Sequence, residues 1–263
     1  NFGNPEKPHI AWQLSESVRG LGDACRALDA PIVGGNVSLY NEGPTGPIYP
    51  TPVIGMVGRL PDARRAGTLG FQRAGDHIAL VGPFSPSPAA SELSKLLGEP
   101  LPDGLPAIDV DAVRDVQIAV RDAVRAGALA SAHDIAEGGL AVALAECCLA
   151  GGLGAEVELG EEFWTAIAPV SALRGAPPAS GPLSAVWTPV TACLFGEGPG
   201  GFIVSAAEDA LRELGERVHV RTIGRVGDDV LTIVEAGATA GTMLTLTLDE
   251  LAAAHGALGE LFS

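Results

Sequence analysis

Short apolar runs of β type alternate with amphipathic helical stretches along this chain. Apolar residues recur at helical spacing over four stretches, 9–29, 109–127, 210–218 and 248–262. Apolar, β-type runs cover 31–40, 51–60, 77–82, 219–226 and 229–234. Residues 128–152 combine a short strand, a polar turn and a helix that ends at Gly151 and Gly152, whereas 191–206 have two β-type arms around glycines. This order predicts an α+β fold, with helices and strands mixed throughout.

A stretch rich in glycine and charge, residues 64–76, separates two of these apolar runs. Such punctuation is typical of a domain junction, which we place near Gly70. The predicted domains are therefore residues 1–69 and 70–263. A second such stretch, residues 175–189, is rich in Pro, Gly and Ser and is predicted to be a surface loop.

The charge balance excludes several classes of partner. The 263 residues carry 32 acidic and 16 basic side chains, a formal charge of −16, which opposes binding to nucleic acid or to anionic membranes. The longest apolar stretch is interrupted by Glu146 and by glycines, so no membrane span is expected. The chain shows no secretory leader and opens at Asn1, and we expect a processed chain or a fragment of a longer one.

Four cysteines stand at positions 25, 147, 148 and 193, without a CxxC pair. Their spacing does not suit a zinc site, and they are too sparse for a disulfide framework. We expect four small buried apolar residues in a reducing compartment, which predicts a cytoplasmic protein.

The stretch PIVGGNVSLYNEG, residues 31–43, is a first candidate site. In a strand, Asn36 and Ser38 share one face while the apolar residues between them face the other way. Gly34 and Gly35 allow another group to approach their amides, which suits a phosphate or a metal ion. The same pattern also fits an amphipathic strand with a glycine bulge that binds nothing.

A second polar cluster follows a short strand, in AHDIAEGGLAVALAE, residues 132–146. Unpaired amides at a helix N-terminus attract anions, and Asp134 beside them can hold a cation that bridges to phosphate. Alternatively, Asp134 caps the helix and His133 is a partly buried histidine with satisfied hydrogen bonds.

Three motifs together resemble the formylglycinamidine ribonucleotide synthase family, in particular the second of its two internal repeats. They are NFGNPEKP at residues 1–8, GGNVSLYNE at 34–42 and HDIAEGGLAVALAE at 133–146. The third motif is shared with the wider group of aminoimidazole ribonucleotide synthase-like, ATP-dependent proteins. The resemblance implies a small N-terminal domain that forms a β-barrel with its counterpart, followed by a larger α/β domain.

The resemblance also implies a ligase activity in purine biosynthesis. MgATP would activate the amide oxygen of formylglycinamide ribonucleotide, and ammonia derived from glutamine would then displace phosphate to give the amidine. Gly35 would contact ATP through its backbone, Asn36 would ligate Mg²⁺ and Ser38 would bind the substrate. By repeat symmetry, Asp134 would line an auxiliary nucleotide or metal site.

Other parts of the active site are expected outside this chain. In the family, the catalytic histidine base and most Mg²⁺-binding carboxylates belong to the first repeat, and an ATP-contacting aspartate precedes the first motif. Expected partners are thus the first repeat of the same enzyme, a separate glutaminase and a small accessory subunit. Where the family has a Ser-Arg pair this chain has Gly200 and Gly201, and no ligand role is assigned there. Two alternatives remain: another ATP-dependent member of the group, or a non-catalytic half that completes a partner's site.

Overall fold

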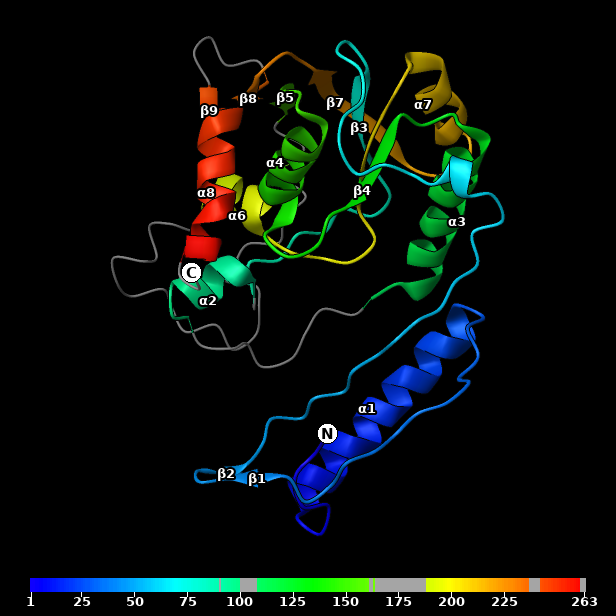
Figure 1. Ribbon diagram of the computed structural model, residues 1–263, viewed down its shortest axis with the longest axis vertical. Coiled ribbons are helices and arrows are strands. Elements are labelled where there is room, and N and C mark those ends of the chain that lie inside the picture. Colours follow the sequence, from blue (N-terminus) through cyan, green and yellow to red (C-terminus); the bar gives the residue numbers. More distant parts are fainter. Residues whose placement is uncertain (90, 100–107, 161–162, 164–187, 237–241, 261–263) are drawn as a thin grey trace. The chain divides into compact units, whose positions relative to one another are not determined.

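The computed structural model describes residues 1–89, 91–99, 108–160, 163, 188–236 and 242–260 (Figure 1). The chain forms two compact units, Asn1–Pro61 and Asp62–Ser263. Residues just after this division belong to the second unit, where the Thr68 hydroxyl donates a hydrogen bond to the Ala130 carbonyl oxygen at 2.9 Å. The predicted boundary after residue 69 lies a little further along the chain, and as a domain assignment it stays a prediction.

The first unit is built around one long helix, α1 (Pro8–Ala27). Proline suits the first turn of a helix because it has no N–H to leave unpaired, and Pro8 begins α1. The helix buries Ile10. A two-stranded antiparallel hairpin follows, β1 (Glu42–Gly43) with β2 (Gly46–Pro47).

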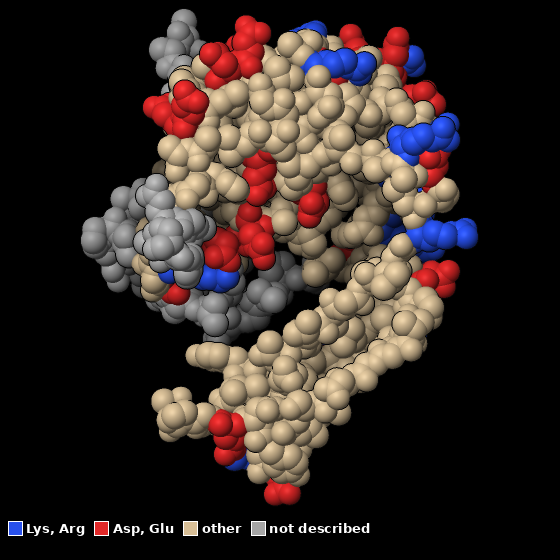
Figure 2. Space-filling model, in the orientation of Figure 1, with Lys and Arg blue, Asp and Glu red and all other residues tan. Residues whose placement is uncertain are grey.

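The strands predicted over 31–40 and 51–60 are not present: both segments are described, and neither contains a strand. A strand needs a hydrogen-bonded neighbour, and within the first unit these segments do not pair with one another. Their apolar side chains are consequently exposed; Val33 is 96% exposed and Val57 fully so. Most of the first unit's visible surface is neither acidic nor basic (Figure 2).

The second unit contains a seven-stranded sheet among its described residues, in the order β4-β6-β3-β7-β5-β8-β9. All neighbouring strands are antiparallel except β5 and β8, which are parallel. This sheet, with helices interleaved along the sequence, confirms the predicted α+β class. The strands are β3 (His77–Val81), β4 (Ser131–Asp134), β5 (Ala155–Leu159), β6 (Phe202–Ala206), β7 (Val220–Val226), β8 (Val230–Glu235) and β9 (Thr242–Thr247).

Helices pack on both sides of this sheet. On one side α4 contacts α6, α8 and β8, and on the other α3 packs with α7 (Figure 1). The described helices of this unit are η1 (Ala63–Arg65), α2 (Glu92–Leu96), α3 (Val110–Ala126), α4 (Gly139–Gly151), α6 (Pro189–Phe195), α7 (Glu208–Gly215) and α8 (Leu248–Glu260). Acidic side chains are spread over the visible face of the unit, interspersed with Lys and Arg (Figure 2).

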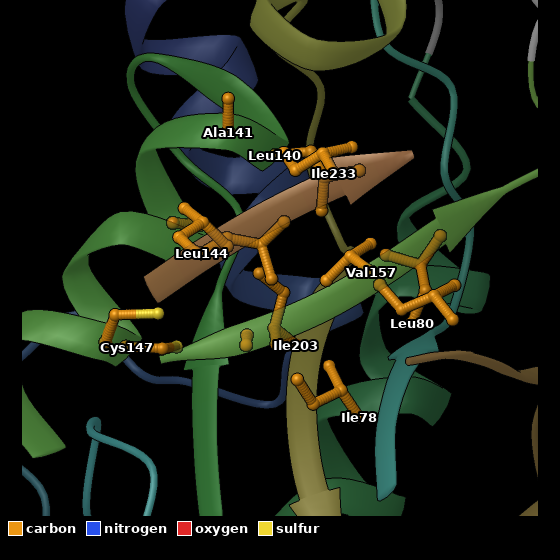
Figure 3. Close-up of a cluster of buried hydrophobic side chains, with 14 of the residues drawn as sticks. Ile78, Leu80, Leu140, Ala141, Leu144, Cys147, Val157, Ile203 and Ile233 are labelled. Atoms are coloured by element: carbon orange, nitrogen blue, oxygen red, sulfur yellow. The ribbon is translucent and has the colours of Figure 1, made fainter. Parts of the chain in front are cut away.

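Alternation along β3 divides the core in two. Ile78 and Leu80 join the cluster beneath α4, whereas Ala79 and Val81 join the cluster beneath α3 and α7. Successive side chains of a strand point to opposite faces, so a strand buried on both sides must be apolar at every position. Figure 3 shows the first cluster, in which side chains of α4 and of β3, β5, β6 and β8 interlock.

The helix predicted over 109–127 is confirmed as α3. The Asp109 carboxylate accepts a hydrogen bond from the Ala112 N–H at 3.0 Å, and Gly127 ends the helix in the left-handed conformation, with φ of 73°. The strand, turn and helix predicted within 128–152 are confirmed as β4 and α4. Gly152 again supplies the left-handed C-terminal residue.

In the second unit, one segment was predicted with the wrong type and two of the described strands were missed; in the first unit the short hairpin of β1 and β2 was not predicted either. Residues 191–195, expected to be a β-type arm, lie in α6, because Thr188 and Thr191 form a capping box and Pro189 occupies the first turn. The strands β5 and β9 were not predicted. The predicted surface loop at 175–189 lies outside the described residues apart from its last two.

The cysteines are free, and three are fully buried: Cys147, Cys148 and Cys193. Cys25 on α1 is only half-buried, which corrects the expectation that all four are core residues. Burial raises the pKa of each of the three buried thiols to about 12. No described helix is long and apolar enough to cross a membrane.

These pKa shifts predict selective thiol chemistry. In the native chain at pH 8, a disulfide reagent such as Ellman's should react rapidly with Cys25 and slowly with the other three thiols, since thiolate is the attacking species. The time course of thionitrobenzoate release measures this. Cys25→Ser should remove the fast phase, and a fast phase that survives in that variant would contradict the described burial.

Candidate functional site

The N-terminal motif docks against the second half of GGNVSLYNE. The Phe2 N–H donates to the Ser38 carbonyl oxygen at 3.0 Å, and the Tyr40 N–H donates to the Gly3 carbonyl oxygen at 3.0 Å. The Asn41 N–H donates to the Phe2 carbonyl oxygen at 3.2 Å. The motif at residues 1–8 and the motif at residues 34–42, which α1 separates in the sequence, are therefore joined by backbone hydrogen bonds.

Side chains fix this docking. The Asn41 carboxamide donates to the Phe2 carbonyl oxygen at 3.0 Å, and Lys7 forms an ion pair with Glu42. Phe2 is buried, and a Cβ on Gly3 would lie 2.7 Å from the Pro47 Cβ, closer than van der Waals contact permits. Sequence reasoning used NFGNPEKP for its resemblance and assigned it no structural role; the structure shows that it anchors the segment 38–41.

Ser38 is the one candidate residue of the first unit whose side chain has described partners. Its hydroxyl accepts a hydrogen bond from the Asn41 Nδ2 at 3.1 Å and lies 3.3 Å from the Asn41 Oδ1. Because Asn41 is itself held by Phe2, the orientation of the Ser38 hydroxyl follows from the docked N-terminus.

Gly35 and Asn36 are exposed, a few residues before the docked segment. A Cβ built on Gly35 would meet nothing within 4 Å, and the backbone φ there is not positive. Nothing in the described part of the chain requires glycine at this position. The Asn36 carboxamide has no hydrogen-bond partner among the described residues, so its oxygen is available to a ligand.

The second cluster lies in the other unit, at the end of β4. His133 is 12% exposed at its side chain, with Nε2 2.9 Å from Glu146 Oε2 and Nδ1 3.3 Å from Asp134 Oδ1. It is thus a mostly buried histidine with a carboxylate at each ring nitrogen, as the alternative interpretation expected. Asp134 is 65% exposed. Asp134 does not cap α4: Gly138 occupies the N-cap position, and no side chain caps the helix from there.

Glu197 binds the backbone at the start of α4, next to this cluster, and sequence reasoning missed it. One of its oxygens, Oε1, accepts from the Gly138 N–H at 2.9 Å and from the Glu92 N–H at 2.7 Å. It thereby joins the start of α4 to the start of α2. The available signal was a single acidic residue inside the glycine-rich stretch 196–201.

The glycine pair of HDIAEGG has a packing role. Gly138 and Gly139 have φ values of 83° and 72°, a region that other residues rarely adopt. A Cβ on Gly139 would lie 2.5 Å from the Gly196 carbonyl oxygen, so the turn lies directly against the segment that carries Glu197. Among the described residues, no group of three or more His, Cys, Asp or Glu side chains is arranged to hold a metal ion.

Comparison with protein families gives two matches. Residues 1–60 match the model for AIR synthase related protein, N-terminal domain, and residues 73–236 match the model for AIR synthase related protein, C-terminal domain.

Curated relatives share about half of the aligned residues. The chain is 51% identical over 168 residues to phosphoribosylformylglycinamidine synthase subunit PurL of Moorella thermoacetica, an alignment of 62% of this chain and 22% of that protein. It is 54% identical over 163 residues to the PurL subunit of Anaeromyxobacter sp., covering 60% of this chain and 21% of that one. The aligned region thus spans about a fifth of the length of these relatives.

Solved structures of PurL from Thermotoga maritima share the fold. The structure described as PurLQS superimposes with a TM-score of 0.58 at 16% identity, over 89% of this chain and 35% of that chain. PurL complexed with ATP gives 0.57 at 15% identity, over 89% and 35%. PurL complexed with FGAR gives 0.57 at 17% identity, over 89% and 36%.

The position of Glu197 predicts a stability effect. Glu197→Ala leaves two backbone N–H groups without their acceptor and should lower the free energy of unfolding by about 1.5–3 kcal/mol. Equilibrium urea unfolding followed by circular dichroism measures this loss. Glu158→Ala, on the exposed face of β5, is the matched control and should change stability by less than about 0.5 kcal/mol. Equal losses in both variants would argue against a joining role for Glu197.

Proposed function

The chain belongs to the family of AIR synthase related proteins, and on that premise we propose that it is part of an ATP-dependent amidotransferase of purine biosynthesis. The reaction is the conversion of formylglycinamide ribonucleotide, ATP and glutamine-derived ammonia into formylglycinamidine ribonucleotide. It is a ligase reaction that forms a C–N bond. Two relatives at 51% and 54% identity carry the name of a subunit of this synthase, which supports the proposal.

The observation that carries the proposal is the docked pair of motifs in the first unit. The hydrogen bonds of residues 1–3 with residues 38–41 hold Ser38 in place, while Gly35 and Asn36 nearby remain exposed. A surface that holds one hydroxyl and leaves a backbone amide and a carboxamide oxygen free has the groups needed to bind a phosphorylated substrate and its metal ion.

In the proposed mechanism each residue has one role. The Gly35 amide approaches ATP, which a side chain at this position would hinder. The Asn36 carboxamide oxygen ligates Mg²⁺, a hard cation that prefers oxygen ligands, and the Ser38 hydroxyl binds the ribonucleotide. Bound Mg²⁺ would neutralise charge on the phosphate oxygens during phosphoryl transfer.

Asn36 fits such a metal ion only as one ligand of several. Its exposed oxygen suits Mg²⁺, but a single amide does not make a Mg²⁺ site, which also needs carboxylate, phosphate or water oxygens. The described residues hold no cluster of carboxylates that would complete it. We therefore assign the remaining ligands to ATP and to a first repeat of the same enzyme.

The exposed β-type segments support the same partner. Apolar side chains such as Val33, Val53 and Val57 are exposed to solvent, in segments whose sequence pattern is typical of strands. A first repeat that adds neighbouring strands would satisfy the backbone groups and bury these side chains. A separate glutaminase and a small accessory subunit are further proposed partners, in keeping with the PurLQS structure of T. maritima.

Two finer assignments complete the proposal. Asp134, exposed at the end of β4, lines an auxiliary nucleotide or metal site. The enzyme acts in the cytoplasm, which agrees with three buried cysteines that remain unpaired. The alternatives, another ATP-dependent member of the group or a non-catalytic half, are separated from this function by the two experiments below.

The first experiment tests completion of the site. The 263-residue chain alone should form no amidine from formylglycinamide ribonucleotide, ATP and ammonia, because it supplies too few metal ligands. Addition of a first-repeat polypeptide from one of the PurL relatives should restore turnover, measured as phosphate release and amidine formation. Turnover by the chain alone would refute the proposal that it holds only part of the active site. ATP hydrolysis that depends on a different acceptor would instead support another ATP-dependent member of the aminoimidazole ribonucleotide synthase-like group.

The second experiment separates Asn36 from Ser38 in the completed enzyme. Asn36→Leu should severely weaken the use of MgATP and leave the melting temperature unchanged, since the side chain is exposed. Ser38→Ala should raise the KM for the ribonucleotide more than that for ATP, by roughly 5- to 30-fold if one hydrogen bond worth about 1–2 kcal/mol is lost.

Ser15→Ala, an exposed serine on α1, is the matched control and should leave both KM values unchanged. Steady-state kinetics against each substrate decides the outcome. Wild-type MgATP kinetics in the Asn36 variant, or equal effects of both substitutions on both substrates, would leave these residues without the proposed roles.

A further inference from the structure

The second unit contains a cavity of about 500 Å³ that involves none of the three motifs. It lies where the segment 82–86 after β3, the first turns of α3 and the segment 217–221 at the start of β7 come together. A cavity of this size is typical of small-molecule sites. The proposed function leaves it without a role.

Backbone contacts hold the walls of this cavity in place. The Gly82 N–H donates to the His219 carbonyl oxygen at 2.9 Å, which joins two of the three segments. Gly82 has a φ of 90°, and a Cβ there would lie 2.8 Å from a methyl carbon of Val116 on α3 and 2.7 Å from the Gly200 carbonyl oxygen. Only glycine therefore permits this close approach of the walls.

Most of the wall is apolar, and part of it is aromatic. The rings of Phe84 and Phe163 meet edge to face, with centroids 6.3 Å apart and an interplanar angle of 68°. Leu80, Pro86 and Val116, all buried, also line the cavity. Such a surface favours a flat ring that can pack against the aromatic pair.

The two arginines of the lining already have partners. The Arg217 guanidinium forms an ion pair with Asp122 at 3.1 Å. The guanidinium carbon of Arg221 lies 4.5 Å from the centroid of the Phe163 ring, over the face of that ring. Neither group is therefore available as the main binding group for an acidic ligand.

Asp115 differs from the arginines in this respect. It is an exposed residue of α3 that lines the cavity, and its carboxylate has no hydrogen-bond or ion-pair partner among the described residues. Together with Asp122 it balances the charge of Arg217 and Arg221, so the surroundings favour neither an anion nor a cation. An ionised carboxylate accepts hydrogen bonds and cannot donate them, so a ligand must supply the donor.

We propose that this cavity, the Phe–Asp pocket, binds a small uncharged molecule with a flat aromatic ring that carries an N–H donor. The ring packs against Phe84 and Phe163, and the N–H donates to the Asp115 carboxylate. An uncharged ligand also loses less hydration than an ion when it enters an apolar cavity.

Three indole probes test this chemistry on the 263-residue chain at pH 7. Indole is uncharged and has an N–H, 1-methylindole lacks the donor, and indole-3-carboxylate adds a negative charge. Titrations of the ¹⁵N-labelled chain, followed by amide chemical shifts, measure each affinity. We expect indole to bind and to shift the amide signals of Gly82 and Val116. Binding should be at least about fivefold weaker for 1-methylindole, which loses one hydrogen bond to a charged acceptor, and weaker still for indole-3-carboxylate.

Matched variants locate the binding. Asp115→Ala should weaken the binding of indole at least about fivefold and leave that of 1-methylindole within about twofold, so that the two probes become alike. Asp111→Ala, an acidic residue of the same helix outside the lining, is the charge-matched control and should bind like the unmodified chain. Phe84→Leu, which keeps every charge, should weaken the binding of all three probes. A thermal melt accompanies each variant.

Several outcomes would overturn the proposal. They are the absence of indole binding at millimolar concentration, amide shifts that lie outside the lining, tighter binding of indole-3-carboxylate than of indole, or an unchanged preference for indole over 1-methylindole in Asp115→Ala. If Phe84→Leu does not fold, the comparison of the three probes on the unmodified chain still decides the matter. None of these measurements uses ATP or the ribonucleotide, so the result is independent of the proposed ligase function.

Discussion

An extended segment forms a β-strand only beside a hydrogen-bonding neighbour, and the structure of the first unit depends on where such a neighbour is available. Residues 1–3 supply one for the segment 38–41, and there the chain is ordered around the buried ring of Phe2. For 31–37 and 52–60 the described residues supply none, and both segments leave apolar side chains exposed. The second unit meets the same requirement internally, since β3 lies between β6 and β7 and is covered by helices on both faces.

This difference explains which structural predictions hold. The helix α3 was predictable because its signals are local: an aspartate cap, an apolar face and a glycine at its end. The prediction of a strand over 31–40 failed. Alternating polar and apolar residues show that a segment can pair with a neighbouring strand, but they do not show whether that neighbour is present. At 191–195 the apolar residues suit either type of element, and the helix was decided by the capping threonines and Pro189 just before them.

The candidate site was predictable to a similar degree. The two polar clusters were found from short-range patterns, but the sequence did not indicate that residues 1–3 lie against 38–41, since that contact joins distant positions. Glu197 was missed for the same reason: its two donors, at Gly138 and Glu92, stand 59 and 105 residues away. The helix N-terminus in HDIAEGG was interpreted as a place for an anion, whereas Gly139 there is needed for close packing against Gly196.

A chain with twice as many acids as bases can bind phosphorylated ligands only where local chemistry opposes the overall charge. Around Asn36 neutral groups are available, so the positive charge must be brought in by a divalent ion. This arrangement makes binding depend on a metal ion and on a partner repeat.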